Sequence, residues 1–241
     1  MEQDYIAVDL ETTGLNAKTD KIIEVGAVRV IGGREISHYH SLVNPRRKLE
    51  SRIVELTGIT DQMVRDAPDF GDILGEFRDF CGNLPLLGHH IMFDYSFLKR
   101  AMVNRGTEFE KKGIDTLTLC RLLMPEAEAK SLEAACSYFG IAREQAHRAL
   151  GDARDAHHLY QRLTQMPEKN QRARGAFDAK PMIYRVKKEQ PASKKQKEDL
   201  RYLLKYHKID VPVEIEFLSR NEVSRLKDNI ISQYGRIGTR D

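Results

Sequence analysis

The chain has 241 residues, 41% hydrophobic and 31% charged, a balance that excludes disordered and fibrous classes and allows one domain with an appendage or two small domains. The net charge of +3 is close to neutral and is informative only once it is located along the chain. No stretch approaches the ~20 apolar residues that span a bilayer, and the first residues lack the pattern of a signal peptide, so we expect a cytoplasmic protein with no membrane partner.

The first predicted elements are three strands. An apolar run at 5–10 is followed by the turn Thr12-Thr13-Gly14. Residues 22–31 and 35–43 are rich in β-branched residues, and Gly32-Gly33 between them is a hairpin signal. The chain is therefore expected to open with three antiparallel strands.

Helices then alternate with short strands. We predict helices at 51–57, 61–66, 70–81, 94–105, 117–123, 131–139 and 150–165, and strands at 84–88 and 113–116. An antiparallel start followed by this alternation is typical of an α/β fold with a mixed sheet that is flanked by helices.

A change of composition marks the end of the first domain near residue 166, where Met166-Pro167 breaks a helix. Residues 168–197 contain ten Lys/Arg against three acids, a pattern of either a solvated linker or a phosphate-binding flank. Two capping boxes, Ser193-x-x-Gln196 and Ser219-x-x-Glu222, then begin helices with apolar stripes. We predict a domain at 1–166, a basic linker at 167–192 and a small two-helix module at 193–241.

Two acids, Asp9 and Glu11, lie two positions apart on the first strand, so both side chains face the same side of the sheet. Adjacent ionised carboxylates repel each other unless a divalent cation balances them or water at an open strand end screens them. The apolar residues between and before them indicate a central strand, which favours the cation.

Three later residues could complete such a site. Asp94 follows the apolar strand at 84–88, where it could also be the N-cap of the next helix. Asp152 has apolar residues four, seven and eleven positions beyond it, so its carboxylate points inward and needs a partner. His147 precedes that helix and is suited to accepting a proton near neutral pH.

Other reactive residues are interpreted as structural. Asp155 is expected to be solvated or ion-paired, and His157 and His158 are expected at the surface. The three cysteines are odd in number and lack a C-x-x-C pair, which indicates buried thiols rather than a zinc site or disulfides.

Three motifs carry a family resemblance. In chain order they are Val8-Asp9-Leu10-Glu11-Thr12-Thr13-Gly14-Leu15, Gly88-His89-His90-Ile91-Met92-Phe93-Asp94 and His147-Arg148-Ala149-Leu150-Gly151-Asp152-Ala153. Over roughly residues 4–165 the chain resembles the DEDDh (DnaQ-like) exonucleases, the family of the epsilon proofreading subunit of bacterial DNA polymerase III. One such motif is weak, whereas three in this order are a specific signal.

The resemblance implies a ribonuclease H-like fold and two Mg²⁺ or Mn²⁺ ions held by Asp9, Glu11, Asp94 and Asp152. Carboxylate oxygens are ligands that suit such ions. It also implies that His147 deprotonates the attacking water. The expected reaction is two-metal-ion hydrolysis of DNA from its 3' end to nucleoside 5'-monophosphates, in proofreading or repair.

The resemblance further implies a substrate contact region. Its residues are Thr12, Thr13, Gly14, Leu15, His90 and Phe93. The expected substrate is single-stranded DNA or a frayed 3' end, and a DNA polymerase is the partner that the family suggests. The chain departs from the family at His90, which stands where the family usually has Asn.

Two alternatives stay open. The chain could be an RNA 3'-end trimming exoribonuclease, because such a site contacts the backbone more than the bases. It could also be a non-catalytic polymerase or nucleic-acid adaptor, although four converging acids argue against this. The C-terminal module with its basic run is hypothesised to be an accessory nucleic-acid grip, which a cut after residue 167 would test.

Overall fold

The structure, a computed structural model, describes residues 2–143, 147–166 and 175–237. Its strands are β1 (Tyr5–Thr12), β2 (Ile22–Ile31), β3 (Arg34–Leu42), β4 (Leu86–Gly88), β5 (Lys112–Asp115) and β6 (Lys180–Pro181). Its helices are α1 (Ser51–Thr57), α2 (Asp61–Arg65), α3 (Phe70–Cys81), α4 (Ile91–Asn104), α5 (Thr116–Leu123), α6 (Leu132–Tyr138), α7 (Ala149–Thr164), α9 (Lys194–His207) and α10 (Arg220–Tyr234).

These elements form two compact units. Unit 1 contains residues 1–45 and 49–186, and unit 2 contains residues 46–48 and 187–241. Of the predicted linker, residues 175–186 lie with unit 1 and residues 187–192 with unit 2. The functional division of the chain at residues 166 and 192 stays a prediction. Within the described ranges, no helix has the length and apolar character needed to cross a membrane.

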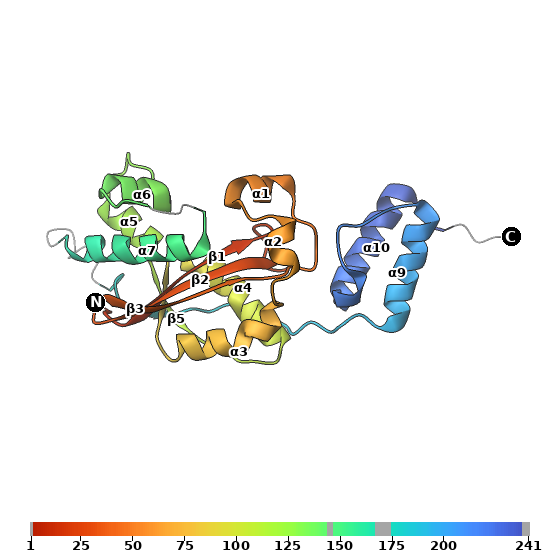
Figure 1. Ribbon diagram of the computed structural model, residues 1–241, viewed down its shortest axis with the longest axis horizontal. Helices are drawn as coiled ribbons and strands as arrows, with labels where there is room; N and C mark the ends of the chain where they lie inside the picture. The colour runs from red at the N-terminus through yellow and green to blue at the C-terminus, as the bar shows by residue number, and fades with distance from the viewer. Residues whose placement is uncertain (1, 144–146, 167–174, 238–241) are drawn as a thin grey trace. The chain divides into compact units, whose positions relative to one another are not determined.

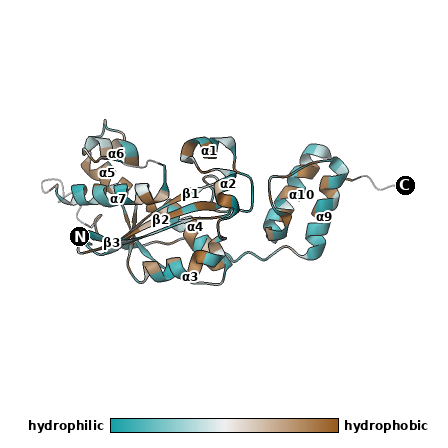
Figure 2. Cartoon of the chain, in the orientation of Figure 1, coloured by the Kyte–Doolittle hydropathy of each residue, from teal (hydrophilic) through white to brown (hydrophobic). Residues whose placement is uncertain are grey.

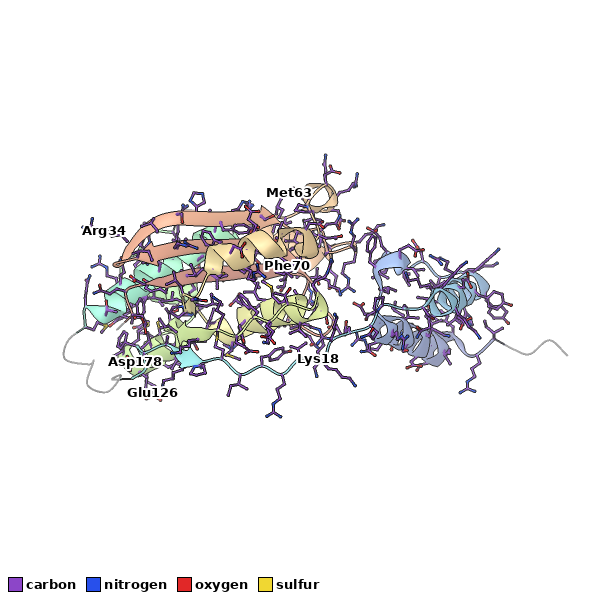
Figure 3. The ribbon with its side chains drawn as sticks, turned by 90° about the horizontal axis from the view of Figure 1, so that it is seen from below. Lys18, Arg34, Met63, Phe70, Glu126 and Asp178 are labelled. Carbon is purple, nitrogen blue, oxygen red and sulfur yellow. The ribbon has the colours of Figure 1, made fainter. Side chains whose placement is uncertain are left out.

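Unit 1 is built on a six-stranded sheet in the order β3-β2-β1-β4-β5-β6. The pairs β3–β2 and β2–β1 are antiparallel, whereas β1–β4 and β4–β5 are parallel. Figure 3 labels Arg34, the first residue of β3, and Met63, on α2, toward opposite ends of this sheet. β1 begins opposite Val30 and ends opposite Ile22 of β2, so it runs away from the end of the sheet at which Arg34 lies. The mixed sheet flanked by helices confirms the predicted fold class.

Helices cover both faces of the sheet. α7 packs across β1 and β2, together with α5 and α6, while α3 and α4 lie on the other face (Figure 1). Because side chains alternate along a strand, Tyr5 and Ala7 enter the core under α7, whereas Ile6 and Val8 enter the core of α3 and α4. The next two odd positions of β1 are Asp9 and Glu11, so the same alternation directs both carboxylates to the α7 side.

Unit 2 pairs α9 with α10 around its own apolar core. The predicted capping boxes are present at Ser193 and Ser219, and each serine side chain accepts a backbone N–H of its helix. The core residues are Ala192, Leu200, Leu203, Leu204, Leu218, Val223 and Ile230. In Figure 2, α9 is largely teal and α10 carries brown stretches.

Two local features differ from the prediction. The helix expected from residue 94 begins at Ile91, so Asp94 lies within its first turn and the N-cap position belongs to His90. This excludes the N-cap alternative for Asp94. The strand β6 was not predicted, and it pairs antiparallel with β5 at the edge of the sheet.

Candidate active site

The predicted acids of β1 and α7 meet at one end of the sheet. Carboxylate oxygens of Asp9, Glu11 and Asp152 all lie within 4.8 Å of one another. Asp9 and Glu11 are partly buried and Asp152 is buried. Residues that are more than 140 positions apart in the chain therefore form one cluster of oxygen atoms.

Asp94 lies beside this cluster. Its side chain is 3% exposed. Its Oδ1 accepts, at 3.1 Å, the backbone N–H of Leu10, the residue of β1 between Asp9 and Glu11. Its charge is close enough to raise the pKa of Asp9. The structure thus brings together all four predicted acids.

Burial and mutual repulsion disfavour the ionised form of these acids. Burial first, and then the charges of Asp94 and Asp152, raise the pKa of Asp9 well above its ordinary value. Burial, followed by the charge of Asp152, raises the pKa of Glu11 to about 8. Four carboxylates that resist ionisation together form the hard, oxygen-only donor set that fits divalent cations.

The start of α7 is held by two arginines, neither of which was predicted from the sequence. Arg143 forms ion pairs with Asp152 and with Asp155, whose Oδ2 lies 2.6 Å from its Nε. Burial raises the pKa of Asp152, while Arg143 opposes that rise. Asp155 is therefore buried and ion-paired, one of the two roles expected for it.

The second arginine, Arg148, binds a carboxylate of β2. Glu24 is fully buried, and its oxygens accept hydrogen bonds from Arg148 Nε at 3.0 Å and from the backbone N–H of Ala149 at 2.9 Å. His40 Nε2 lies 2.7 Å from the same carboxylate. These hydrogen bonds lower the pKa of Glu24 against the effect of burial, so it is an ionised anchor for the first turn of α7. The sequence feature that could have indicated this anchor is the position of Glu24, an acid, within an otherwise apolar strand.

His147 lies one residue before Arg148. It is exposed, and its φ of 58° is in the left-handed region, which only a few per cent of residues other than glycine adopt. Its charge is one of the influences that lower the pKa of Asp152. A side chain in this position is open to solvent and electrostatically in reach of the cluster.

The turn after β1 borders the cluster and is internally hydrogen-bonded. Thr12 Oγ1 donates to the carbonyl of Gly14 at 2.7 Å, and Thr13 Oγ1 accepts the N–H of Lys21 at 3.0 Å. Leu15 is 85% exposed. The turn that follows Glu11 therefore presents an apolar side chain to solvent.

His90 and Phe93 flank the start of α4. His90 has a φ of 76°, and its N–H donates to Asp115 Oδ1 at 2.8 Å. Asn adopts this left-handed conformation readily and His tolerates it, which accounts for the departure from the family pattern. Phe93 is partly buried, with its ring centroid 5.1 Å from that of Phe97.

His157 differs from the prediction. It was expected at the surface, but it is 3% exposed and its Nδ1 lies 2.8 Å from the hydroxyl of Tyr5. Burial lowers its pKa to about 4, so it is neutral. His158 is exposed, as predicted, and the three cysteines are buried and free.

The chain matches known proteins over this domain. The RNase_T family model, described as Exonuclease, matches residues 6–160. The chain is 44% identical over 154 residues to the DNA polymerase III PolC-type of Bacillus subtilis, a match that covers 63% of this chain and 11% of the polymerase. The chain thus spans about a tenth of the length of such relatives.

Solved structures share the fold. Exonuclease X in complex with 5' overhanging duplex DNA superposes with a TM-score of 0.57 at 25% identity, over 68% of this chain and 93% of that chain. Exonuclease I of E. coli, in complex with a dT13 oligonucleotide, superposes with a TM-score of 0.61 at 18% identity, over 70% of this chain and 42% of that chain. Because the family model matches well over half of the residues, this chain belongs to the DnaQ-like exonuclease family.

Proposed function

We propose that this chain is a metal-dependent 3'-5' exonuclease of the DEDDh type, which releases nucleoside 5'-monophosphates from single-stranded DNA or frayed 3' ends. The observation that carries the proposal is the meeting of the Asp9, Glu11 and Asp152 oxygens within 4.8 Å. These residues and Asp94 would hold two Mg²⁺ or Mn²⁺ ions. When bound, such ions polarise a phosphoryl group and lower the pKa of water.

In this proposal, residues of the chain carry out the proton transfer and position the substrate. An imidazole nitrogen of His147 accepts a proton from the attacking water, whose oxygen forms a bond to the terminal phosphorus as the bond from phosphorus to the leaving 3' oxygen breaks. The leaving oxygen takes up a proton and becomes the new 3' hydroxyl. The exposed position of His147, next to the anchored Arg148, supports this role because the ring can reach solvent and substrate.

The turn after β1 supplies the substrate contacts in this proposal. Thr12, Thr13 and Gly14 border the terminal nucleotide, and the exposed Leu15 offers apolar surface to a base. His90 contacts the substrate at the start of α4. Phe93 supports that helix from its core side.

The names of relatives favour a setting in DNA replication or repair. Relatives are DNA polymerases, and solved neighbours were captured with DNA. A proofreading role, a polymerase partner and a cytoplasmic location belong to the proposal because the chain covers only a small part of those polymerases.

The test is an assay of 3'-labelled and 5'-labelled single-stranded DNA, mismatched primer ends and RNA, with and without Mg²⁺ or Mn²⁺. Shortening from the 3' end, dependent on the metal and faster on DNA, is expected. Faster shortening of RNA would favour the exoribonuclease alternative. A wild-type protein inert on every substrate would favour the adaptor.

A matched pair of variants assigns the activity to the cluster. Asp152→Asn removes an oxygen ligand and should lower kcat by more than the ~100-fold that removal of an outer-shell partner can cause. Asp155→Asn is the control, because Asp155 is buried on the same helix and pairs with the same arginine but lies outside the oxygen cluster. Equal activity of the two variants would contradict the assignment.

A further inference from the structure

Residues 187–241, the larger part of unit 2, lie beyond the matched residues 6–160 of the exonuclease domain. The unit has its own apolar core between α9 and α10. It contains sixteen Lys/Arg against nine Asp/Glu, a net charge of +7, so the rest of the chain carries −4. The positive charge of the protein is therefore concentrated in a unit that, apart from residues 46–48, lies outside the family match.

One face of α9 combines exposed aromatic and basic side chains. Leu200, Leu203 and Leu204 occupy the opposite, buried face. Tyr202 is 62% exposed and Tyr206 is 52% exposed. They lie one turn apart on the outer face, about 6 Å along the helix axis.

Two lysines share this outer face with the tyrosines. Lys195 lies seven residues, or two turns, before Tyr202, and Lys205 lies three residues after Tyr202, so each lies on the same side of the helix as that ring. Within the described part of the chain, neither lysine forms an ion pair and Tyr202 makes no ring contact. The ring of Tyr206 contacts that of His207 edge-on, with centroids 4.9 Å apart, and is still 52% exposed, so all four side chains can reach a partner.

The acids near this face are already matched. Glu198 lies 3.9 Å from Lys194, and Asp199 lies 3.5 Å from Lys227 of α10. The neighbouring Arg201 pairs with Glu216. These three acids are thus paired with basic residues of the unit, while Lys195 and Lys205 add two positive charges to the face.

We propose that the outer face of α9 binds single-stranded nucleic acid, with Lys195 and Lys205 holding phosphates and Tyr202 and Tyr206 stacking on bases. Lysines interleaved with exposed aromatic rings are the combination that binds single strands, because every base has a π-face and every nucleotide a phosphate. A duplex hides its base faces and leaves the tyrosines without a role. The inference rests on the proposed function only in taking the held strand to be the substrate.

The experiment measures fluorescence anisotropy of labelled dT20 and U20 with the full-length protein in EDTA, where no hydrolysis takes place. Tyr202→Ala with Tyr206→Ala should weaken binding about 10-fold or more, while the matched Tyr→Phe pair keeps wild-type affinity because its rings still stack. Tyr138→Ala, which removes an exposed tyrosine of unit 1, is the control and should bind as wild type.

The lysines are tested through the salt dependence. Lys195→Ala with Lys205→Ala should make the slope of log K against log salt shallower by about 1.4, which corresponds to two lost phosphate contacts on a single strand. Each variant is first shown to unfold at the wild-type temperature. Unchanged affinity and slope in both double variants would overturn the proposal and leave a protein partner as the occupant of this face.

The two proposals can fail separately. Asp9→Ala should bind dT20 in EDTA at least as tightly as wild type, because the cluster is not needed for the α9 contact and loses an acid that opposes a polyanion. If the wild-type protein degrades no substrate but the tyrosine variants lose binding, the proposed nuclease activity is overturned and the α9 binding surface stands. If the wild-type protein is an active nuclease and none of the four α9 substitutions changes binding, the α9 surface is overturned and the nuclease activity stands.

Discussion

At the scale of single residues, Glu24 is a fully buried carboxylate that fixes the start of α7 through Arg148, Ala149 and His40. α7 carries Asp152, and His147 lies immediately before Arg148. The position of both therefore depends on Glu24, which lies opposite Glu11 in the β1–β2 register but is not one of the clustered carboxylates.

Glu24→Gln should therefore reduce both stability and turnover. A hydrogen bond to a charged group contributes about 1.5–3 kcal/mol, so we expect a loss of about 2 kcal/mol in the free energy of unfolding. A displaced site should also lower kcat by on the order of 10-fold or more. Denaturant unfolding and steady-state kinetics measure the two effects.

The chain offers a control for Glu24→Gln on the neighbouring strand. Glu35 of β3 pairs with Arg154 of α7, 2.9 Å from Nη2, but at the surface. Such a pair contributes at most about 1 kcal/mol, so Glu35→Gln should leave stability and kcat close to wild type. Indistinguishable variants would show that burial of Glu24 does not matter.

The raised pKa of Glu11 predicts how the metal-free protein responds to pH. Its pKa in the folded state is about 8, against an ordinary value of 4.5. Between these values the folded protein binds more protons than the unfolded chain, so stability falls as pH rises through this window. We expect a loss on the order of 2 kcal/mol between pH 5 and 8.5, allowing for the partial exposure of the side chain.

Thermal unfolding in EDTA at both pH values measures this loss. Glu11→Gln should flatten the dependence, because the side chain no longer ionises. Added Mg²⁺ should raise Tm more at pH 8.5 than at pH 5, because the ionised carboxylates are the form that binds it. A wild-type Tm that does not change with pH would contradict the electrostatic account of the cluster.

At the scale of elements, α7 approaches β2 so closely that Gly26 has no room for a side chain. A Cβ at Gly26 would lie 2.1 Å from the backbone nitrogen of Leu150. Gly26→Ala should push the first turn of α7 away from the sheet, with a loss of about 1–3 kcal/mol and a large loss of activity, since Asp152 lies in that turn.

Gly75→Ala is the matched control. Gly75 lies in α3, where an added Cβ would meet nothing within 4 Å. Alanine is the better helix former, so this change should stabilise the protein by about 0.5–1 kcal/mol and leave activity unchanged. Unfolding and nuclease assays of both variants distinguish the general effect of replacing a glycine by alanine from the specific clash of a new Cβ with the backbone of α7.

How far the sequence predicts these elements depends on the range of the interactions. The helices at 51–57 and 70–81 agree with the structure because their apolar spacing is local. The start of α4 was missed because the left-handed His90 leaves no periodic signal. β6 was missed because two residues at a sheet edge carry almost no pattern.

The same distinction applies to the site. Motif spacing was enough to identify the four acids, and the structure brings them together. The anchoring of Arg148 by Glu24 depends on a contact across 124 positions, which no local pattern encodes. The burial of His157 likewise depends on Tyr5, at the far end of the chain.

At the scale of the whole molecule, the separation of charge matches the two proposed tasks. The part with −4 contains the acid cluster, which disfavours a polyanion until cations bind, and unit 2 with +7 attracts a polyanion at any metal concentration. Binding to unit 2 would raise the local concentration of strand at the cluster without a new contact there.

A truncation tests this division, and the structure determines where to cut. A cut after residue 167, the boundary taken from sequence, also removes residues 175–186 from unit 1. That segment holds β6 and the buried side chains of Phe177 and Met182, which are 2% and 6% exposed. Loss of large buried side chains costs about 2–5 kcal/mol each, a large share of a typical stability of about 5–15 kcal/mol.

The chain ending at residue 186 should therefore fold and cleave, whereas the chain ending at 167 should unfold at a much lower temperature. The chain ending at residue 186 keeps the oxygen cluster, so its kcat on saturating oligonucleotide should stay within about 2-fold of wild type. Its KM should rise and the salt dependence of KM should flatten, because unit 2 no longer holds phosphates. Circular dichroism melts and nuclease rates between 50 and 200 mM salt measure both. An unchanged KM after the cut at 186 would show that unit 2 does not hold the substrate.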